Sequence, residues 1–105
     1  VPADDPRRNA GWQRAILCDA ERLPAAHFHA MPVEAADLER AAADYEAVLE
    51  RVGGVLPTLD VVHLGLGADG HTASLVPGDA VLEARDRDVA ATAAPYQGTR
   101  RMTLA

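Results

Sequence analysis

The chain contains a single cysteine, Cys18, among its 105 residues. One thiol cannot close an intramolecular disulfide, and it does not supply the thiolate cluster of a structural zinc site. The chain also lacks an uninterrupted apolar run of the roughly 20 residues that a membrane-spanning helix requires. The lone cysteine favours a reducing compartment. We therefore expect a cytoplasmic protein in which Cys18 is a small buried residue.

Basic residues are in the minority, with 10 Lys plus Arg against 16 Asp plus Glu and a formal net charge of −6. Nucleic acids and anionic membranes select basic protein surfaces, so this balance argues against both as partners. A small-molecule substrate is the better expectation. The length fits one domain with a modest core.

Apolar periodicity predicts two helices. The first covers residues 10–23, with Asn9 as its N-cap and Pro24 just beyond its end. The second follows Pro32 and ends at the Gly53-Gly54 pair, because glycine readily adopts the left-handed conformation that closes a helix. One face of this second helix carries Leu38, Ala41, Ala42, Tyr45, Val48, Leu49 and Val52.

Four stretches are predicted as strands. Residues 59–66 form a nearly continuous apolar run, which is typical of a strand buried on both faces of a parallel sheet. Residues 89–94 and 101–104 are predicted as two further strands, separated by a turn at 95–98. Alternation of apolar residues with His27 and His29 favours a short strand at 27–31. Helices combined with a buried strand indicate an α/β layered domain.

The segment LGLGADGHTASL, residues 64–75, follows the predicted buried strand. Open α/β folds bind their ligands at the carboxyl ends of the strands. Gly65, Gly67 and Gly70 permit a sharp turn whose amide groups are free to face an anion or a developing oxyanion. The turn presents Asp69 and His71 at the same rim. Because histidine titrates near neutral pH, His71 is a candidate general base.

Three alternatives remain for this turn. Its glycines match the G-x-G-x-x-G dinucleotide fingerprint, but Pro77-Gly78 leaves room for only about two turns of the long helix that this motif opens. A metal site of His63, Asp69 and His71 matches no helical or ribbon spacing, and we expect His63 to be a hydrogen-bonded core histidine. The third alternative is structural, with His71 only tying the loop down.

Residues 67–74 read Gly-x-Asp-Gly-His-Thr-Ala-Ser and closely resemble the signature of the 6-phosphogluconolactonase family. Two further matches occur in the expected order, namely Val1-Pro2 with Asp5 and Asn9, and the run at 101–104. The sister glucosamine-6-phosphate deaminases follow the Asp-Gly-His core with an Ile-Ala-Phe-Asn type stretch, which residues 72–75 do not match. Two positions depart from the family: Arg8 replaces a small serine, and Ala105 a threonine or serine.

The resemblance implies an α/β fold related to glucosamine-6-phosphate isomerase/deaminase, a three-layer α/β/α sandwich with a mainly parallel sheet. It implies hydrolysis of 6-phosphoglucono-1,5-lactone to 6-phosphogluconate in the oxidative pentose phosphate pathway, with neither a metal nor an organic cofactor. The implied catalytic residues are His71 as the base and Asp69 beside it. The implied substrate-binding residues are Gly65, Gly67, Gly70, Asn9 and Arg101, the last at the substrate phosphate.

The resemblance also predicts how the chain is divided. The family's phosphate loop would precede Val1 and its closing helices would follow Ala105. We therefore expect residues 1–105 to be the middle portion of a single domain, truncated at both ends and with little activity by itself. An alternative from a different functional class is a non-catalytic sugar-phosphate-binding domain on the same fold, which would keep the glycine turn and need no base.

Overall fold

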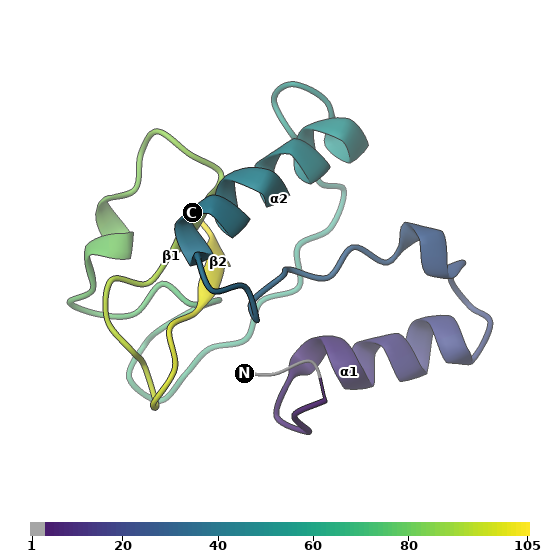
Figure 1. Ribbon diagram of the computed structural model, residues 1–105, viewed down its shortest axis with the longest axis horizontal. Helices are drawn as coiled ribbons and strands as arrows, with labels where there is room; N and C mark the ends of the chain where they lie inside the picture. Colours follow the sequence, from purple (N-terminus) through teal and green to yellow (C-terminus); the bar gives the residue numbers. More distant parts are fainter. Residues whose placement is uncertain (1–3) are drawn as a thin grey trace.

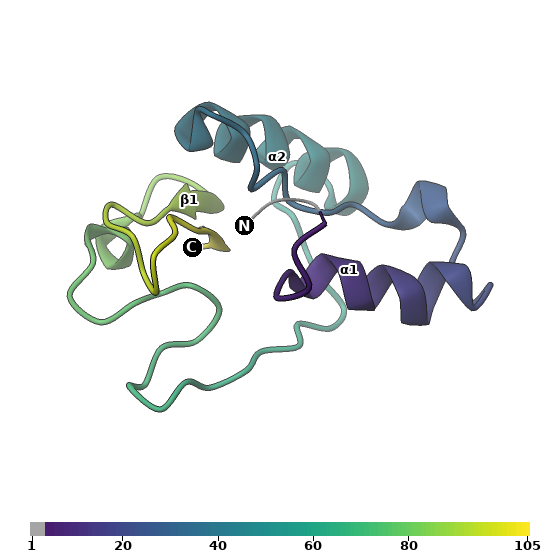
Figure 2. The same cartoon turned by 60° about the horizontal axis from the view of Figure 1, so that its bottom comes forward.

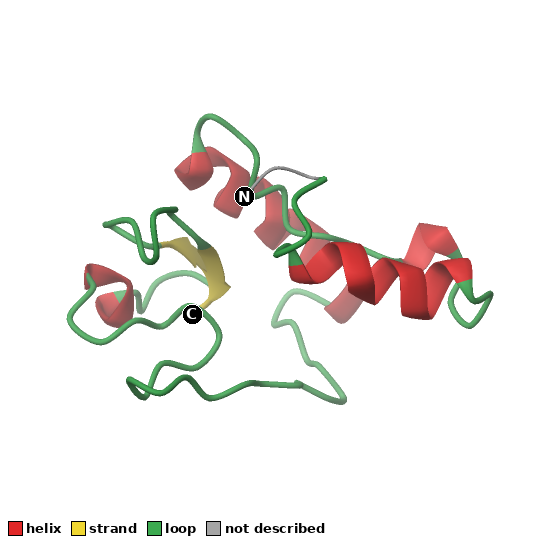
Figure 3. Cartoon of the chain, turned by 90° about the horizontal axis from the view of Figure 1, so that it is seen from below, coloured by secondary structure: helices red, strands yellow, loops and turns green. Residues whose placement is uncertain are grey.

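The computed structural model of the chain describes residues 4–105 and contains two α-helices, shorter helical turns and one small sheet. In chain order the elements are α1 (Asn9–Arg14), the π-helix η1 (Ala15–Asp19), the 3₁₀ helix η2 (Ala25–His27), α2 (Leu38–Gly53), the 3₁₀ helix η3 (Ala80–Glu83), β1 (Val89–Ala91) and β2 (Met102–Leu104). Figure 1 shows α2 beside the sheet and α1 apart from it. A long stretch between α2 and η3 is drawn as loop in Figure 3.

The core lies where α2 packs on the two-stranded sheet, an arrangement visible in Figure 2. Strands β1 and β2 are antiparallel, with Val89 opposite Leu104 and Ala91 opposite Met102. The helix contributes residues spaced three and four apart, so their side chains share one face. The buried cluster consists of Leu38, Ala41, Ala42, Val89, Ala91 and Met102. The predicted amphipathic helix and the strands within 89–94 and 101–104 are confirmed.

Both ends of α2 follow the local sequence. The side chain of Asp37 accepts a hydrogen bond from the Arg40 backbone N–H at 3.0 Å, which satisfies a free donor of the first turn. Gly54 has φ of 90°, a value that favours glycine, and its N–H donates to the Glu50 carbonyl at 2.9 Å. The prediction that Gly53 and Gly54 end this helix is confirmed.

Two side chains of α2 fix the helix to the strand pair. The Oε1 atom of Glu46 accepts from the backbone N–H groups of Asp88 and Val89, at 2.7 and 3.1 Å. Glu39 accepts from Arg100 Nη2 at 2.7 Å, just before β2. These bonds join positions more than 40 residues apart, so they set the orientation of the strand pair relative to the helix.

The N-terminal helix is confirmed, but its predicted cap and end are wrong. Asn9 is the first helical residue, and the extended Arg8 takes the N-cap position without a side-chain cap bond. Arg8 is anchored elsewhere, because its Nη2 donates to the Met31 carbonyl at 3.1 Å. The helical run stops at Asp19 rather than at residue 23, since Glu21 adopts a positive φ of 57°. No residue of α1 is buried.

The predicted buried strand at residues 59–66 is wrong for the part of the chain that the structure describes. The segment is irregular, and Val61 and Leu66 are 83% and 82% exposed. Its one pairing is an isolated antiparallel bridge between Leu66 and Thr72. A strand buried on both faces needs neighbouring strands and covering helices. The only sheet within residues 4–105 is the antiparallel pair β1 and β2, so this segment has no parallel partner.

Other local predictions also fail for lack of a partner. The strand at 27–31 is absent, since η2 occupies its start and the His29 carbonyl accepts from the Tyr45 hydroxyl at 2.6 Å rather than from a strand. His63 is exposed instead of lying in a core, because the segment around it is not covered. Cys18 is only partly buried.

None of the helices within residues 4–105 has the length and apolar character needed to cross a membrane.

Candidate active site

Residues 65–72 form a closed turn. The Gly67 N–H donates to the His71 carbonyl at 2.8 Å, and the Gly70 N–H donates to the Gly67 carbonyl at 3.0 Å. Gly70 has φ of 89°, which favours glycine there. The Thr72 hydroxyl donates to the Gly65 carbonyl at 3.1 Å and ties the two arms together. Asp69 and His71 are therefore carried at the end of a short, internally bonded loop.

This geometry is not that of a dinucleotide fingerprint. In that motif the glycines lead directly into a long helix whose N-terminus faces the pyrophosphate. Here Gly70 is followed by a second turn, in which the Leu75 N–H donates to the Thr72 carbonyl at 2.9 Å. The next helical element is the four-residue η3. The structure agrees with the sequence argument against a nucleotide.

The segment after His71 is attached to the sheet. The Ser74 N–H donates to the hydroxyl of Thr103 at 3.1 Å, and that hydroxyl donates to the Leu104 carbonyl at 2.8 Å. Thr103 is 2% exposed and lies on β2, in the two-stranded sheet. The backbone amide of Ser74 thus makes this connection.

Asp79 provides a second attachment. Its Oδ1 accepts from the N–H groups of Val81 and Ala93, each at 2.9 Å, and its Oδ2 accepts from the Ala94 N–H at 3.1 Å. These bonds, with the one from Ala93 contributing most, lower the pKa of the Asp79 carboxyl below its usual value. The carboxylate therefore connects the start of η3 with the end of β1.

Asp69 and His71 form a hydrogen-bonded pair. His71 Nδ1 lies 2.5 Å from Asp69 Oδ1, and the His71 backbone N–H donates to the same oxygen at 3.2 Å. Tyr96 donates its hydroxyl to the other oxygen, Oδ2, at 2.8 Å. The His71 ring contributes most to holding the pKa of Asp69 far below its usual value, followed by the Tyr96 hydroxyl and the His71 amide. Asp69 is consequently a carboxylate at neutral pH.

The second ring nitrogen of His71 is open. Within residues 4–105, Nε2 makes no hydrogen bond, and it is not among the polar atoms buried without a partner. The side chain as a whole is 22% exposed. An imidazole held by a carboxylate on one nitrogen and open to solvent on the other has the arrangement of a general base.

The amides of the turn differ from the sequence expectation. Those of Gly67 and Gly70 are used within the loop and do not face a ligand. The N–H groups of Ala68 and Asp69 have no hydrogen-bond partner among the described residues. The Gly65 N–H likewise has no partner among the described residues, so these three amides of the turn are available to an oxyanion.

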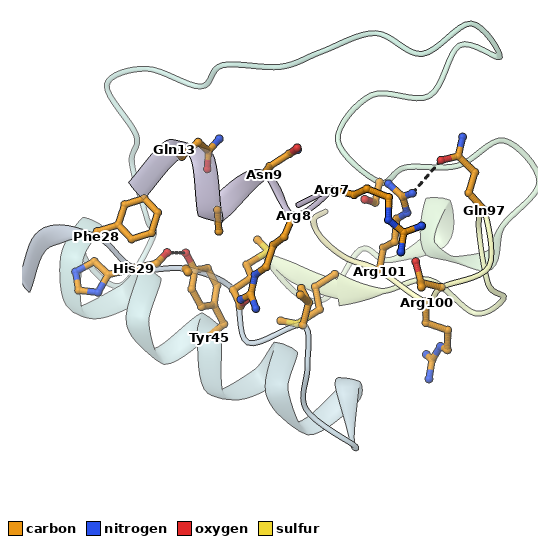
Figure 4. A pocket seen from close by; sticks show the side chains of 17 residues that line it. Arg7, Arg8, Asn9, Gln13, Phe28, His29, Tyr45, Gln97, Arg100 and Arg101 are labelled. Atoms are coloured by element: carbon orange, nitrogen blue, oxygen red, sulfur yellow. Dashed lines mark hydrogen bonds between the residues drawn. The ribbon is translucent and has the colours of Figure 1, made fainter. Parts of the chain in front are cut away.

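A cavity of about 700 Å³ lies between the N-terminal segment, residues 28–33, α2 and the β1–β2 connection, with Ser74 on its wall. Figure 4 shows the polar and basic side chains that line it. Of the residues predicted to bind substrate, Asn9 and Arg101 line this cavity, whereas the three glycines do not, and neither do the predicted catalytic residues Asp69 and His71. The structure therefore divides the predicted site into a histidine turn and an arginine-lined cavity.

Four arginines line the cavity, and three of them are paired with a carboxylate. The pairs are Arg7 with Asp5 at 2.6 Å, Arg8 with Glu34 at 2.9 Å and Arg100 with Glu39 at 2.7 Å. Arg101 has no carboxylate partner among the described residues; its Nη2 donates to Gln97 Oε1 at 3.1 Å, and its Nε is buried without a hydrogen bond. Arg101 is accordingly the cation of this cavity best placed to meet an anion.

Tyr96 joins the two regions and was missed in the sequence. Its hydroxyl reaches Asp69, its ring meets His71 edge-on with centroids 5.2 Å apart, and the Arg101 guanidinium lies 5.1 Å from its ring centroid. The sequence predicted only a turn at 95–98. No local pattern indicates that this turn folds back onto residues 69–71.

The remaining predicted residues are less specific. Gly65 contributes its carbonyl to the Thr72 hydroxyl, and a side chain at this position would meet open space. The Val1-Pro2 part of the family match lies outside the described residues. Within residues 4–105, no three His, Cys, Asp or Glu side chains are grouped so that they could hold a metal ion, and His63 lies in an exposed segment.

Comparison with known proteins gives consistent matches along the sequence. The family described as glucosamine-6-phosphate isomerases/6-phosphogluconolactonase matches residues 1–105. A 6-phosphogluconolactonase of Synechocystis sp. is 38% identical over 108 residues, and one of Mesorhizobium japonicum is 43% identical over 110 residues; each alignment covers 99% of this chain and 44% of the relative. A human protein named GDH/6PGL endoplasmic bifunctional protein is 35% identical over 108 residues, 99% of this chain and 14% of its own length.

The chain thus spans less than half the length of these curated relatives. No solved structure matches it.

Proposed function

This chain belongs to the glucosamine-6-phosphate isomerase/6-phosphogluconolactonase family, and from that premise we propose that its protein hydrolyses 6-phosphoglucono-1,5-lactone to 6-phosphogluconate. The relatives that cover the chain almost completely carry the name 6-phosphogluconolactonase, which supports the lactonase over the deaminase branch. The reaction belongs to the oxidative pentose phosphate pathway, and we assign it to the cytoplasm.

The observation that carries this proposal is the Asp69–His71 pair. Asp69 remains ionised and lies 2.5 Å from Nδ1, so the Nδ1 proton is held on that side of the ring. The lone pair is then on Nε2, which has no partner within residues 4–105. His71 is the general base in this proposal, and Asp69 orients it.

In the reaction, His71 Nε2 takes a proton from water as the water oxygen bonds to the lactone carbonyl carbon. The resulting tetrahedral oxyanion accepts hydrogen bonds from amides of the turn, with those of Gly65, Ala68 and Asp69 available. The bond between this carbon and the ring oxygen breaks, and the proton passes from His71 to the departing alkoxide. A lactone is an activated ester, so no covalent nucleophile is needed and Ser74 has no part in the chemistry.

Arg101 is proposed to contact the substrate phosphate, and Asn9 to contact the sugar. Arg101 is the cavity arginine without a carboxylate partner among the described residues, which supports its role in binding an added anion. Its contact with Tyr96 connects the cavity with the histidine turn. An Arg101→Gln variant should raise KM for the phosphorylated lactone without changing KM for the unphosphorylated one.

Residues 1–105 are proposed to be the middle portion of one three-layer α/β/α domain with a mainly parallel sheet. The exposed apolar segment 59–66 supports this, because its composition suits a strand covered on both faces while the described chain covers neither. In the complete domain this segment would lie in the sheet, directly before the histidine turn.

The decisive experiment replaces His71 by alanine in the product of the complete gene. General-base catalysis typically contributes about 100- to 10,000-fold, so kcat should fall by that factor after correction for spontaneous hydrolysis. His27→Ala is the matched control, because His27 is exposed and lies outside the cavity.

If the His71→Ala variant hydrolyses the lactone at the parental rate, the proposed function is wrong. A parental protein that binds 6-phosphogluconate without any turnover would instead identify a sugar-phosphate-binding domain.

A further inference from the structure

Tyr96 lies at the centre of the contacts around the histidine turn. It is half-buried and sits in the tight turn between β1 and β2, in which Gln97 and Gly98 have φ of 52° and 84°. Backbone bonds in both directions between Tyr96 and Thr99, at 2.9 and 3.3 Å, close this turn. The backbone position of Tyr96 is therefore fixed by the turn that connects the two strands.

The hydroxyl of Tyr96 has one proton, which it donates to Asp69 Oδ2 at 2.8 Å. Its oxygen lies 3.4 Å from His71 Nδ1 and faces that nitrogen only as an acceptor. Asp69 Oδ1, on the same nitrogen at 2.5 Å, also accepts. Both oxygen neighbours of Nδ1 are acceptors, so the ring proton belongs on Nδ1 and the lone pair on Nε2.

Tyr96 and Asp69 keep their protonation states at neutral pH. Hydrogen bonding to Asp69, followed by desolvation, raises the pKa of the Tyr96 hydroxyl above its usual value. The pKa of Asp69 is lowered, chiefly by the His71 ring and then by Tyr96. Tyr96 consequently stays a donor and Asp69 an acceptor, and their roles do not exchange.

The ring of Tyr96 adds a steric constraint. It meets the His71 ring at an interplanar angle of 61° with centroids 5.2 Å apart, an edge-on arrangement that aromatic rings favour. Arg101 lies 5.1 Å from the ring centroid, where a cation is attracted to the π face. Arg101 thus holds the Tyr96 ring in place, and the Tyr96 ring limits rotation of the His71 imidazole.

We propose that Tyr96 is a positioning residue for the Asp69–His71 pair: its hydroxyl fixes the carboxylate and its ring edge fixes the imidazole, so that His71 presents an unprotonated Nε2. This inference rests on the proposed function, because it assigns Tyr96 a part in preparing the base. It also makes a statement about the His71 tautomer that does not require turnover to test.

The test is Tyr96→Phe in the product of the complete gene, which removes the hydroxyl and keeps the ring. Two quantities are measured: kcat and KM for the lactone, and the His71 tautomer from its side-chain ¹⁵N chemical shifts. We expect kcat to fall about tenfold, equivalent to about 1.4 kcal/mol, with KM within about twofold of the parent. We expect the Nδ1–H form to become a mixture of both tautomers.

Tyr45→Phe is the matched control. The Tyr45 hydroxyl donates to the His29 carbonyl at 2.6 Å and makes no bond to Asp69 or His71. This variant also loses one tyrosine hydrogen bond, but the His71 tautomer should remain that of the parent. Equal tautomer changes in both variants would mean that a general loss of packing is responsible and would overturn the proposal.

A Tyr96→Phe variant with the parental tautomer, or with the parental kcat, likewise overturns the positioning role. Failure of the proposed function is recognised separately, from undiminished hydrolysis in His71→Ala. In that event the tautomer measurement still decides whether Tyr96 orients the pair.

Discussion

The backbone of Gly67 lies against the imidazole ring of His71. A Cβ atom at position 67 would be 2.0 Å from Cε1 and 2.1 Å from Nδ1 of His71, and 2.9 Å from Asp69 Oδ1. Gly67 does not have the positive φ that favours glycine at position 70. The glycine at 67 is required for space, and the space is occupied by the two side chains proposed to carry out the chemistry.

Gly67→Ala is predicted to displace His71 while the loop persists. Relieving a 2.0 Å contact requires a ring shift of about 1 Å or more, and a misplacement of that size lowers turnover by about 100-fold. Steady-state kinetics and a thermal melt of the complete gene product measure both effects. Gly11→Ala is the control, because a Cβ there meets nothing within 4 Å. Parental kcat in Gly67→Ala would show that the observed ring position is not the working one.

Thr103→Val is predicted to loosen the connection between the histidine turn and the sheet. The change preserves the shape of the side chain but removes the hydroxyl that accepts from the Ser74 N–H. Thr103 is only 2% exposed, so water does not readily replace this hydroxyl. An unsatisfied donor in such a place costs about 1–3 kcal/mol of unfolding free energy, measurable by urea denaturation. Thr58→Val, at an exposed position, should change stability by less than about 0.5 kcal/mol. Equal effects of the two changes would contradict the anchoring role of Thr103.

Asp79 is predicted to make stability depend on pH in the acid range. Its pKa is lower in the folded than in the unfolded state, so it stabilises the fold above the unfolded value near 3.8, and this contribution is lost as the pH falls through the folded pKa. The free energy of unfolding should therefore decrease below about pH 5. Asp79→Asn cannot titrate and should be less stable at pH 7 with a shallower acid slope. Parallel curves for parent and variant would exclude this role.

The segment 59–66 is predicted to be protected in the complete protein. If it becomes a strand covered on both faces, its backbone amides should exchange slowly with deuterium. Val61→Asp should then destabilise the protein by about 3–5 kcal/mol, because a charge would be buried without a partner. Fast exchange at these amides, together with an unchanged free energy of unfolding in Val61→Asp, would show that Val61 remains exposed in the complete protein.

Local sequence was sufficient for α2 and insufficient for two of the four predicted strands. Leu38, Ala41 and Ala42 share a face through spacing alone, and Gly54 ends the helix through its own backbone preference. The run at 59–66 has an equally clear strand composition, yet it is irregular because no described strand pairs with it. Asn9 failed as a cap for a related reason, since the distant Met31 carbonyl anchors Arg8.

By itself, the sequence determined the long helix, the glycine turn, its adjacent aspartate and histidine, and the family to which they belong. Each depends on residues within a few positions of one another, where chain connectivity alone ensures proximity. Tertiary structure alone decided that Tyr96 completes the Asp69–His71 pair and that Arg101 is the cavity arginine without a carboxylate partner among the described residues. Tyr96 is 27 residues from Asp69 and 25 from His71 along the chain, and the hydrogen bonds that attach Ser74 and Asp79 to the strand pair hold these distant groups close to one another.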